Sequence, residues 1–183
     1  MISSPVCTAL VALACASGQA NAGDLSPLSD FGTSPINNES AFLTQVGQNN
    51  IAVIDQRLPN AWSGGNYAEI GQHGAGNIVR TLQEGDANRL RVAQLGNDNY
   101  ANITQQGSRN AVDLQQNDSG SRFTAVQRGD DNLIVHLQPG GSTGTINQLG
   151  DRNIIKLNQS LSAVGLNIGE ITQKGNEIRI QQN

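Results

Sequence analysis

Apolar and polar residues alternate along most of the chain in short blocks that repeat about every 11 residues. In the block Asn88–Gln94, Leu90 and Val92 are apolar, and the residues between them are charged or small. A period of two places alternate side chains on opposite faces of a strand, so Asn88, Leu90, Val92 and Gln94 share one face. The pattern predicts short β-strands that bury an Asn-apolar-apolar-Gln face and expose the other face to water.

Glutamine closes each block, and three residue types keep a fixed spacing around it. Glutamine recurs at Gln45, Gln56, Gln72, Gln83, Gln94, Gln105, Gln116, Gln127, Gln138, Gln148, Gln159, Gln173 and Gln182. Six residues earlier stands an asparagine or, in three copies, Glu39, Ser121 or Ser142; the asparagines are Asn50, Asn66, Asn77, Asn88, Asn99, Asn110, Asn132, Asn153, Asn167 and Asn176. Two residues after the glutamine stand Gly47, Gly74, Gly85, Gly96, Gly107, Gly129, Gly140, Gly150 and Gly175. The unit occurs in 13 copies.

Repeats this short and regular predict an all-β fold, a β-solenoid in which two strands and their turns form a coil of about 22 residues. The 13 strands should stack in an amyloid-like manner, each on its second neighbour, about 4.8 Å away. The inward Asn and Gln side chains are expected to form ladders with identical residues above and below, which would satisfy their buried amides. The glycine that follows nine of these glutamines is expected to supply the positive φ of a tight turn. On the outer face, the same stacking would bring Glu69, Arg91 and Asp113 together.

Departures from the 11-residue spacing are expected to fall in turns. The intervals of 16 residues after Gln56 and 14 residues after Gln159 both keep an asparagine six residues before the next Gln. The extra residues therefore lie in segments 57–65 and 160–166, which we interpret as enlarged turns. Pro59 agrees with this, because proline is unfavourable inside a paired strand.

Composition excludes several classes of protein. The chain has 21 Asn and 18 Gln, together about a fifth of its 183 residues, and only 3% of its residues are aromatic. So few bulky apolar groups rule out a conventional aromatic-rich core. The formal charge is −4 and the 11 Lys and Arg are scattered, so nucleic-acid binding is not expected.

The first 22 residues resemble a secretory signal peptide. The apolar run from Val6 to Ala16 is too short to span a bilayer, and the small-x-small sequence at residues 20–22 favours cleavage before Gly23. The usual basic residues are missing, since no Lys or Arg precedes Arg57, and a misassigned start codon would explain this. Lipidation of Cys15 is the alternative. Cys7 and Cys15 are the only cysteines, so the chain after cleavage would have no disulfide.

The repeat resembles the curlin family, the subunits of the curli amyloid fibres on bacterial surfaces. The resemblance is carried by Asn-Arg-Leu-Arg-Val-Ala-Gln-Leu-Gly-Asn-Asp-Asn-Tyr-Ala-Asn-Ile-Thr-Gln-Gln-Gly at residues 88–107 and extends over residues 39–183. Asn replaces the family's opening Ser in most units. Segment 23–38 stands where the family has a secretion-targeting segment, but it lacks the Gly-rich character of a major subunit. The choice between a major subunit and a minor, nucleating subunit therefore stays open.

The resemblance implies a secreted structural protein and not an enzyme. Such a subunit would be exported unfolded, cross the outer membrane through a dedicated curli secretion channel with accessory factors, and polymerise outside the cell. Its partners would be copies of itself and other curlin subunits, in extracellular fibres for cell adhesion and biofilm matrix. Independently, open strand edges at the ends of a solenoid are templates for pairing. Strand 176–182 is expected to accept strand 39–45 of the next copy. A non-polymerising solenoid adhesin is the alternative.

No residue pattern predicts catalysis, a metal site or a cofactor. We interpret His73 as a solvated turn residue and His136 as an inward residue in an aliphatic position. The acidic pairs Asp130-Asp131 and Glu84-x-Asp86 are expected in turns, where they would aid solubility; the Gly-rich calcium repeat that would make them cation sites is missing. Outward threonines are interrupted by charged residues, so the flat array of an ice-binding solenoid is not built.

Overall fold

The computed structural model describes residues 7–15, 20–21, 39–58, 64–159, 167–173 and 177–182, with the side chains of residues 39–58 and 64–158. Every regular element in these ranges is a β-strand, which confirms the predicted all-β class. The strands are β1 (Cys7–Cys15), β2 (Ala20–Asn21), β3 (Ser40–Gln48), β4 (Asn50–Leu58), β5 (Tyr67–Ala75), β6 (Ile78–Asp86), β7 (Arg89–Leu95), β8 (Tyr100–Ser108), β9 (Ala111–Asn117), β10 (Arg122–Arg128), β11 (Leu133–Gln138), β12 (Thr143–Leu149), β13 (Ile154–Gln159), β14 (Asn167–Gln173) and β15 (Glu177–Gln182).

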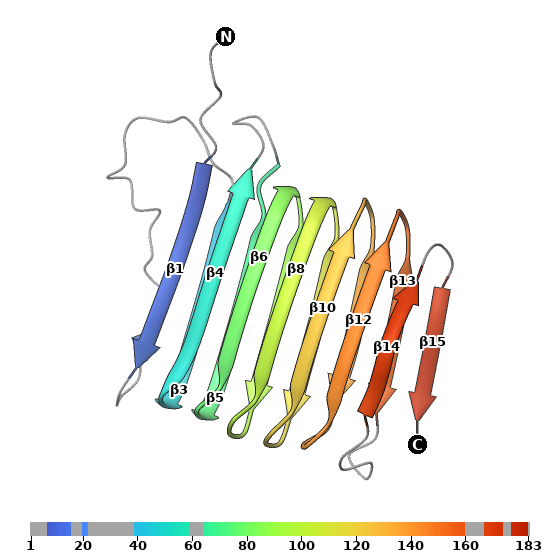
Figure 1. Ribbon diagram of the computed structural model, residues 1–183. Helices are drawn as coiled ribbons and strands as arrows, with labels where there is room; N and C mark the ends of the chain where they lie inside the picture. Colours follow the sequence, from blue (N-terminus) through green and yellow to red (C-terminus); the bar gives the residue numbers. More distant parts are fainter. Residues whose placement is uncertain are drawn as a thin grey trace.

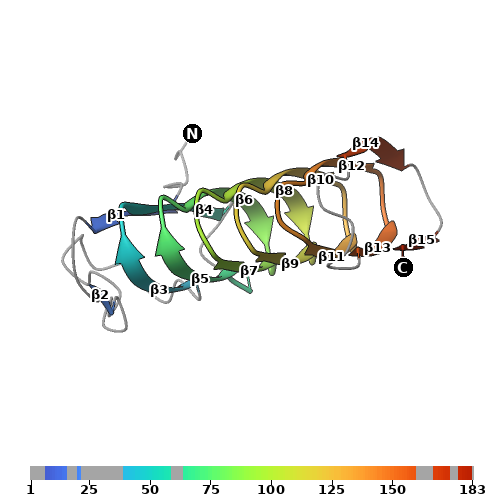
Figure 2. The same ribbon diagram turned by 90° about the horizontal axis from the view of Figure 1, so that it is seen from below.

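The strands form two facing sheets (Figures 1 and 2). Sheet A has the order β1-β4-β6-β8-β10-β12-β14, and sheet B has the order β15-β13-β11-β9-β7-β5-β3-β2. From β3 onward each strand pairs in parallel with the strand two positions later, and Gln94 pairs with Gln116, one 22-residue coil further on. The β-solenoid with two strands per coil is therefore confirmed.

The core lies between the two sheets and consists of the predicted inward positions. Leu90, Val92, Ile103 and Leu114 are almost completely buried, as are the ladder asparagines and glutamines of the same strands. On the outer face of sheet B, Glu69, Arg91 and Asp113 occupy successive register positions. Arg91 Nε lies 3.8 Å from Glu69 Oε2, and such an exposed ion pair contributes little stability. Burial of the inward face is therefore what stabilises the stack.

In the uncleaved chain, residues of the first 22 cover the N-terminal edges of both sheets; the open edges predicted from the sequence concern the chain after cleavage. Strand β1 pairs antiparallel with β4, and β2 pairs antiparallel with β3. The edges of β3 and β4 present backbone groups that need partners, and the extended apolar run of β1 supplies them to β4. The signal-peptide interpretation concerns a cleavage step and stays a prediction. Segment 23–38 lies outside the described residues.

The enlarged turns leave the stacking unchanged. Strand β5 pairs with β3 so that Gln45 faces Gln72, although 27 residues separate them. Residues 59–63 and 160–166 themselves lie outside the described residues. After the second of these segments the register differs from expectation, because Asn167 pairs with Thr143 and not with Ser142. The pairing skips Gly169 as a β-bulge, and this extra residue restores the expected register from Glu170 onward.

Candidate functional site: amide ladders and sheet edges

The inward glutamines form one hydrogen-bonded ladder in each sheet. In sheet B, each Nε2 donates to the Oε1 of the next coil along Gln45, Gln72, Gln94, Gln116 and Gln138, with distances of 2.6 to 2.9 Å. In sheet A, the same bonds run along Gln56, Gln83, Gln105, Gln127 and Gln148 at 2.8 to 2.9 Å. The two ladders satisfy amide groups that are buried in the core.

From Gln56 to Gln148, each ladder glutamine also joins the two sheets through its second amide hydrogen. Gln94 Nε2 in sheet B donates to the carbonyl oxygen of Ile78 in sheet A at 3.2 Å. Gln105 Nε2 in sheet A donates to the carbonyl oxygen of Arg89 in sheet B at 3.1 Å. The acceptor is always close to the first residue of the preceding strand, so one side chain stabilises both the stack and the corner of its coil.

The hydrogen bonds of both glutamine ladders run in one direction, and the first acceptor of each ladder receives no hydrogen bond in the described part of the chain. Every donor points toward the C-terminal coil, so Gln45 and Gln56 receive no amide hydrogen from an earlier coil. Their Oε1 atoms are buried, and among the described residues neither has a hydrogen-bond partner. A buried acceptor without a partner destabilises the fold unless another group occupies the position. The N-terminal edge therefore presents two unfilled acceptors, one in each ladder.

The asparagines form columns of a different kind from the expected amide-to-amide ladder. Asn50 Oδ1 accepts from the backbone N–H of Asn77 at 3.0 Å, and Asn77 Nδ2 donates to the carbonyl oxygen of Gly96 at 2.8 Å. The column in sheet B adds side-chain bonds, such as Asn88 Nδ2 to Asn66 Oδ1 at 3.0 Å. Asparagine thus ties each strand start to the turn of a neighbouring coil. Its Oδ1 accepts a hydrogen bond from the following coil, whereas the Oε1 of a ladder glutamine accepts one from the preceding coil.

Serine replaces asparagine at two positions of the sheet A column. The hydroxyls of Ser121 and Ser142 both donate to the carbonyl oxygen of Pro139, each at 2.6 Å. This is where the repeat interval shortens to 10 residues, between Gln138 and Gln148. A short hydroxyl side chain therefore makes the turn contact that the longer amide makes in other coils.

Backbone contact between coils explains the glycines after the ladder glutamines. Gly74 has a φ of 122°, and a Cβ built on it would lie 1.9 Å from the carbonyl oxygen of Gly96 in the next coil. Only glycine fits so close an approach at this φ. The other described glycines that stand two residues after a ladder glutamine and have a positive φ are Gly47, Gly85, Gly96, Gly107, Gly129 and Gly150.

Two turns differ from the glycine expectation. Gly140 does not have a positive φ; in that shortened turn the left-handed residue is Gly141, with a φ of 67°. After Gln116 the position of the glycine is held by Asp118, with a φ of 73°. Aspartate tolerates the left-handed region better than most residues, which explains its presence there. Gly175 lies outside the described residues.

A second left-handed position, immediately before the asparagine or serine, was not identified from the sequence. It is held by Asn49, Gly65, Gly76, Ala87, Asp98, Arg109, Gly120, Asp131, Gly141 and Arg152. Glycine, asparagine and aspartate are enriched at this position, and that enrichment was the available signal. The enrichment is incomplete, because Ala87, Arg109 and Arg152 adopt the same positive φ although they are none of these residue types.

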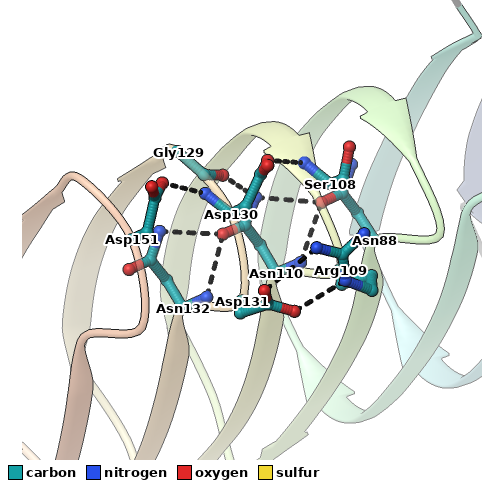
Figure 3. A network of polar contacts seen from close by, with 9 residues as sticks. All are labelled: Asn88, Ser108, Arg109, Asn110, Gly129, Asp130, Asp131, Asn132 and Asp151. Carbon is teal, nitrogen blue, oxygen red and sulfur yellow. Dashed lines mark hydrogen bonds and ion pairs between the residues drawn. The ribbon is translucent and has the colours of Figure 1, made fainter.

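The turn carboxylates bind backbone groups of neighbouring coils (Figure 3). Asp130 Oδ1 accepts from the N–H of Ser108 at 2.7 Å, and Asp151 Oδ1 accepts from the N–H of Asp130 at 2.8 Å. Arg109 binds both carboxylate oxygens of Asp131, at 2.7 and 3.0 Å. These residues, interpreted from the sequence as solubilising, also connect successive turns along one edge of the solenoid.

The second acidic pair makes contacts of the same kind. Glu84 Oε2 accepts from Gln106 Nε2 at 3.1 Å, and Asp86 accepts from the backbone N–H of Gly64. Both partners belong to adjacent coils. The acidic pairs therefore have structural partners within the solenoid.

For the last units, the structure describes backbone pairing alone. Gln159 pairs with Gln182, and Gln173 pairs with Gln148, so these glutamines keep the ladder register. Asn153 lies in the described core, where its Nδ2 donates to Asn132 Oδ1 at 2.8 Å. Asn176 lies outside the described residues. Over the described residues, β14 and β15 are the C-terminal strands of sheets A and B.

Two titratable groups, the half-buried Glu39 and the buried His136, are candidates for pH dependence. Burial raises the pKa of Glu39 to about 7; a hydrogen bond with Asn66 opposes this shift and the charge of Asp55 adds to it. Burial lowers the pKa of His136 to about 4, and a contact with the backbone of Leu157 opposes that shift. Glu39 heads the asparagine column at the N-terminal edge, and His136 lies in the core. His73 is exposed on β5.

The described residues contain no group of three His, Cys, Asp or Glu side chains that could hold a metal ion. A helical membrane span is also missing from the described ranges, whose regular elements are all strands. The chain matches no known protein family, and it has no match among curated proteins or solved structures.

Proposed function

We propose that this chain is a structural subunit of an extracellular curli-type amyloid fibre, which polymerises end to end for cell adhesion and biofilm matrix. The observation that carries the proposal is the parallel, in-register stacking of identical glutamines through both sheets. Stacked strands with amide ladders are the arrangement that amyloid fibres extend without limit. The resemblance of the repeat to the curlin family supports the same role.

Export would prepare the chain for assembly. In the proposed sequence of events, residues 1–22 are a signal peptide and are removed before Gly23. Strands β1 and β2 belong to this segment and cover the edges of β4 and β3. Their removal would open both N-terminal edges outside the cytoplasm. Intact-mass measurement of the exported protein tests this step, and retention of Met1 or a lipid on Cys15 would overturn it.

The proposed partners are copies of the same chain and other curlin subunits, together with an outer-membrane secretion channel and its accessory factors. A minor subunit that starts fibres at the cell surface would use the same repeat. The two roles differ in kinetics, because a nucleating subunit assembles without a long lag and accelerates assembly of another curlin subunit. The identity of the chain as a main fibre component is the primary proposal.

The test is polymerisation of the purified chain from Gly23 at micromolar concentration, followed by thioflavin fluorescence and negative-stain microscopy. We expect fibres with a cross-β reflection near 4.8 Å, with or without added seeds. A chain that stays monomeric and thioflavin-negative, even with preformed fibres added, would contradict the fibre role. That result would favour the soluble solenoid adhesin.

A further inference from the structure

The two sheets of the solenoid contain different numbers of strands. Without β1 and β2, sheet A has six strands, from β4 to β14, and sheet B has seven, from β3 to β15. Figure 2 shows the two sheets as separate layers, with β14 and β15 at the same end of the solenoid. A second copy that continues both sheets must accommodate this difference of one strand.

The two halves of a coil have the same local geometry, so a strand of one sheet can take the place of a strand of the other. Gln94 in sheet B and Gln105 in sheet A each donate to a carbonyl oxygen 16 residues earlier. The following glycines, Gly96 and Gly107, have φ values of 110° and 115°. A half-turn about the solenoid axis therefore exchanges the sheets without changing the contacts of the glutamine ladders.

We propose that successive copies join with a half-turn about the solenoid axis, so that β3 of the next copy pairs with β14 and β4 of the next copy pairs with β15. The inference rests on the proposed fibre function. The arrangement expected from the sequence, with strand 39–45 on strand 176–182, would pair β3 with β15 and keep each sheet in line. It would leave the space of one strand in sheet A, between β14 and β4 of the next copy. Backbone groups along both edges of that space would lack partners.

The glutamine ladders favour the same junction. Gln45 Oε1 and Gln56 Oε1 are buried acceptors without partners at the N-terminal edge. Gln173 and Gln182 hold the last register positions of the two ladders. The half-turn places Gln173 one strand before Gln45 of the next copy, and Gln182 one strand before Gln56 of the next copy. The in-line arrangement places a glutamine before Gln45 alone, and Gln56 faces the space in sheet A.

The half-turn has a consequence for the fibre surface. Phe42 and Arg91 lie on the outer face of sheet B, and this face would alternate between the two sides of the fibre from one copy to the next. Thirteen strands at two per coil rise about 31 Å along the solenoid axis. A given face would therefore recur on the same side of the fibre about every 62 Å. An in-line fibre would present the outer face of sheet B on one side only.

Disulfide cross-linking between copies tests the junction. The chain from Gly23 lacks Cys7 and Cys15, so an introduced cysteine can form a disulfide only with another introduced cysteine. If Gln45 follows Gln173 in the ladder, Thr44 lies beside Thr172, about 4.8 Å away between Cα atoms, which suits a disulfide. By the same register Asp55 lies beside Gln181. In the in-line arrangement, Thr44 lies beside Gln181 instead.

We therefore expect fibres of Thr44→Cys/Thr172→Cys and of Asp55→Cys/Gln181→Cys to become covalent multimers on mild oxidation, whereas Thr44→Cys/Gln181→Cys gives monomers on a non-reducing gel after fibre dissolution. Multimers of Thr44→Cys/Gln181→Cys, with none for the other two pairs, would overturn the half-turn. Fibres in which no pair cross-links would overturn it too. If the unmodified chain from Gly23 forms no fibres, the proposed function itself fails.

A second measurement covers the case in which paired cysteines prevent assembly. A single Asp113→Cys on the exposed outer face of sheet B can carry a gold label in fibres. The half-turn predicts labels on alternating sides, about 31 Å apart along the axis. Deleting residues 89–99 removes one strand and equalises the sheets, so labels on that variant should all lie on one side. Labels on one side of the full-length fibre would contradict the proposal.

Discussion

The imidazole of His136 packs against the ring of Phe123 across the core, with ring centroids 4.8 Å apart and an angle of 37° between the planes. His136 belongs to β11 of sheet B and Phe123 to β10 of sheet A. Gly144 lies beside them, and a Cβ built there would be 3.7 Å from His136 Nε2. The aromatic pair thus occupies a space that leucine, isoleucine and valine fill in other coils.

Replacing His136 by Leu should stabilise the fold and reduce its sensitivity to acid. Neither ring nitrogen has a hydrogen-bond partner among the described residues, and burial lowers the pKa of His136 from 6.5 to about 4. Between these values the unfolded chain binds a proton more readily, so stability should fall as pH decreases from 6.5 to 4, by up to about 3 kcal/mol. Urea unfolding of both proteins at pH 7.5 and 4.5 measures the effect. Equal losses at pH 4.5 would exclude His136 as the cause.

Replacing Gln94 by Leu should destabilise the solenoid strongly. The substitution removes the donor to Gln116, the acceptor for Gln72 and the donor to Ile78, so that three polar groups in or beside the core each lose one hydrogen bond. Each such group costs about 1–3 kcal/mol. The matched control is Gln106→Leu, because the bonds of Gln106 with Glu84 and Arg128 are exposed. Similar urea midpoints for the two variants would show that the ladders contribute little.

Replacing Gly74 by Ala should prevent normal stacking of its turn, whereas Gly71→Ala should be tolerated. At Gly74 the new Cβ would collide with the carbonyl oxygen of Gly96, and the φ of 122° is unfavourable for alanine. At Gly71 a Cβ would meet no atom within 4 Å. We expect Gly74→Ala to cost about 2 kcal/mol or more, in line with other strained backbone positions. Circular dichroism and urea unfolding check this, and equal stability would contradict the close approach of the two turns.

Replacing Glu39 by Gln should stabilise the N-terminal coil at pH 8 more than at pH 5. Burial raises the pKa of Glu39 from 4.5 to about 7, so the folded state holds a proton more tightly than the unfolded state. The unmodified chain should lose stability as pH rises from 4.5 through 7, and the glutamine variant should lose less. Hydrogen exchange of the amides of β3 at both pH values measures this. Glu84→Gln, on the opposite sheet, is the control. If both variants change the hydrogen exchange of β3 equally, Glu39 is not the source of the pH dependence.

Replacing Ile178 and Ile180 by Pro should block fibre growth while most coils stay folded. Both residues lie in β15, and their backbone donors face β13, because the outward residues of each strand donate to the following coil and the inward residues to the preceding one. Proline at these positions therefore detaches the strand on which the next copy would pair. The remaining coils keep their own contacts, because the energetics of a solenoid are nearly nearest-neighbour. Ile178→Val/Ile180→Val is the control that keeps the backbone donors. Normal thioflavin kinetics of the proline variant would show that fibres grow through another surface.

The sequence alone determined the strands, their inward faces and the residues of the ladders. These features depend on local alternation and on a repeat that needs no knowledge of distant contacts. Leu90, Val92 and Gln94 share a face in any extended strand, and the 22-residue period then makes Gln116 the neighbour of Gln94. Insertions could be assigned to turns for the same reason, since the spacing from Asn66 to Gln72 survives them.

Tertiary structure decided what depends on neighbouring coils. The direction of the glutamine donors, the backbone partners of Asn77 and the bulge at Gly169 follow from the three-dimensional register between strands. The left-handed conformation of Ala87 is imposed by the stacked turns against its own preference. The odd number of strands, and with it the unequal size of the sheets, is visible in the repeat count. What the N-terminal edge presents to a second copy, the buried Oε1 acceptors of Gln45 and Gln56, was decided by the tertiary structure, because the direction of a ladder depends on how stacked side chains orient toward one another.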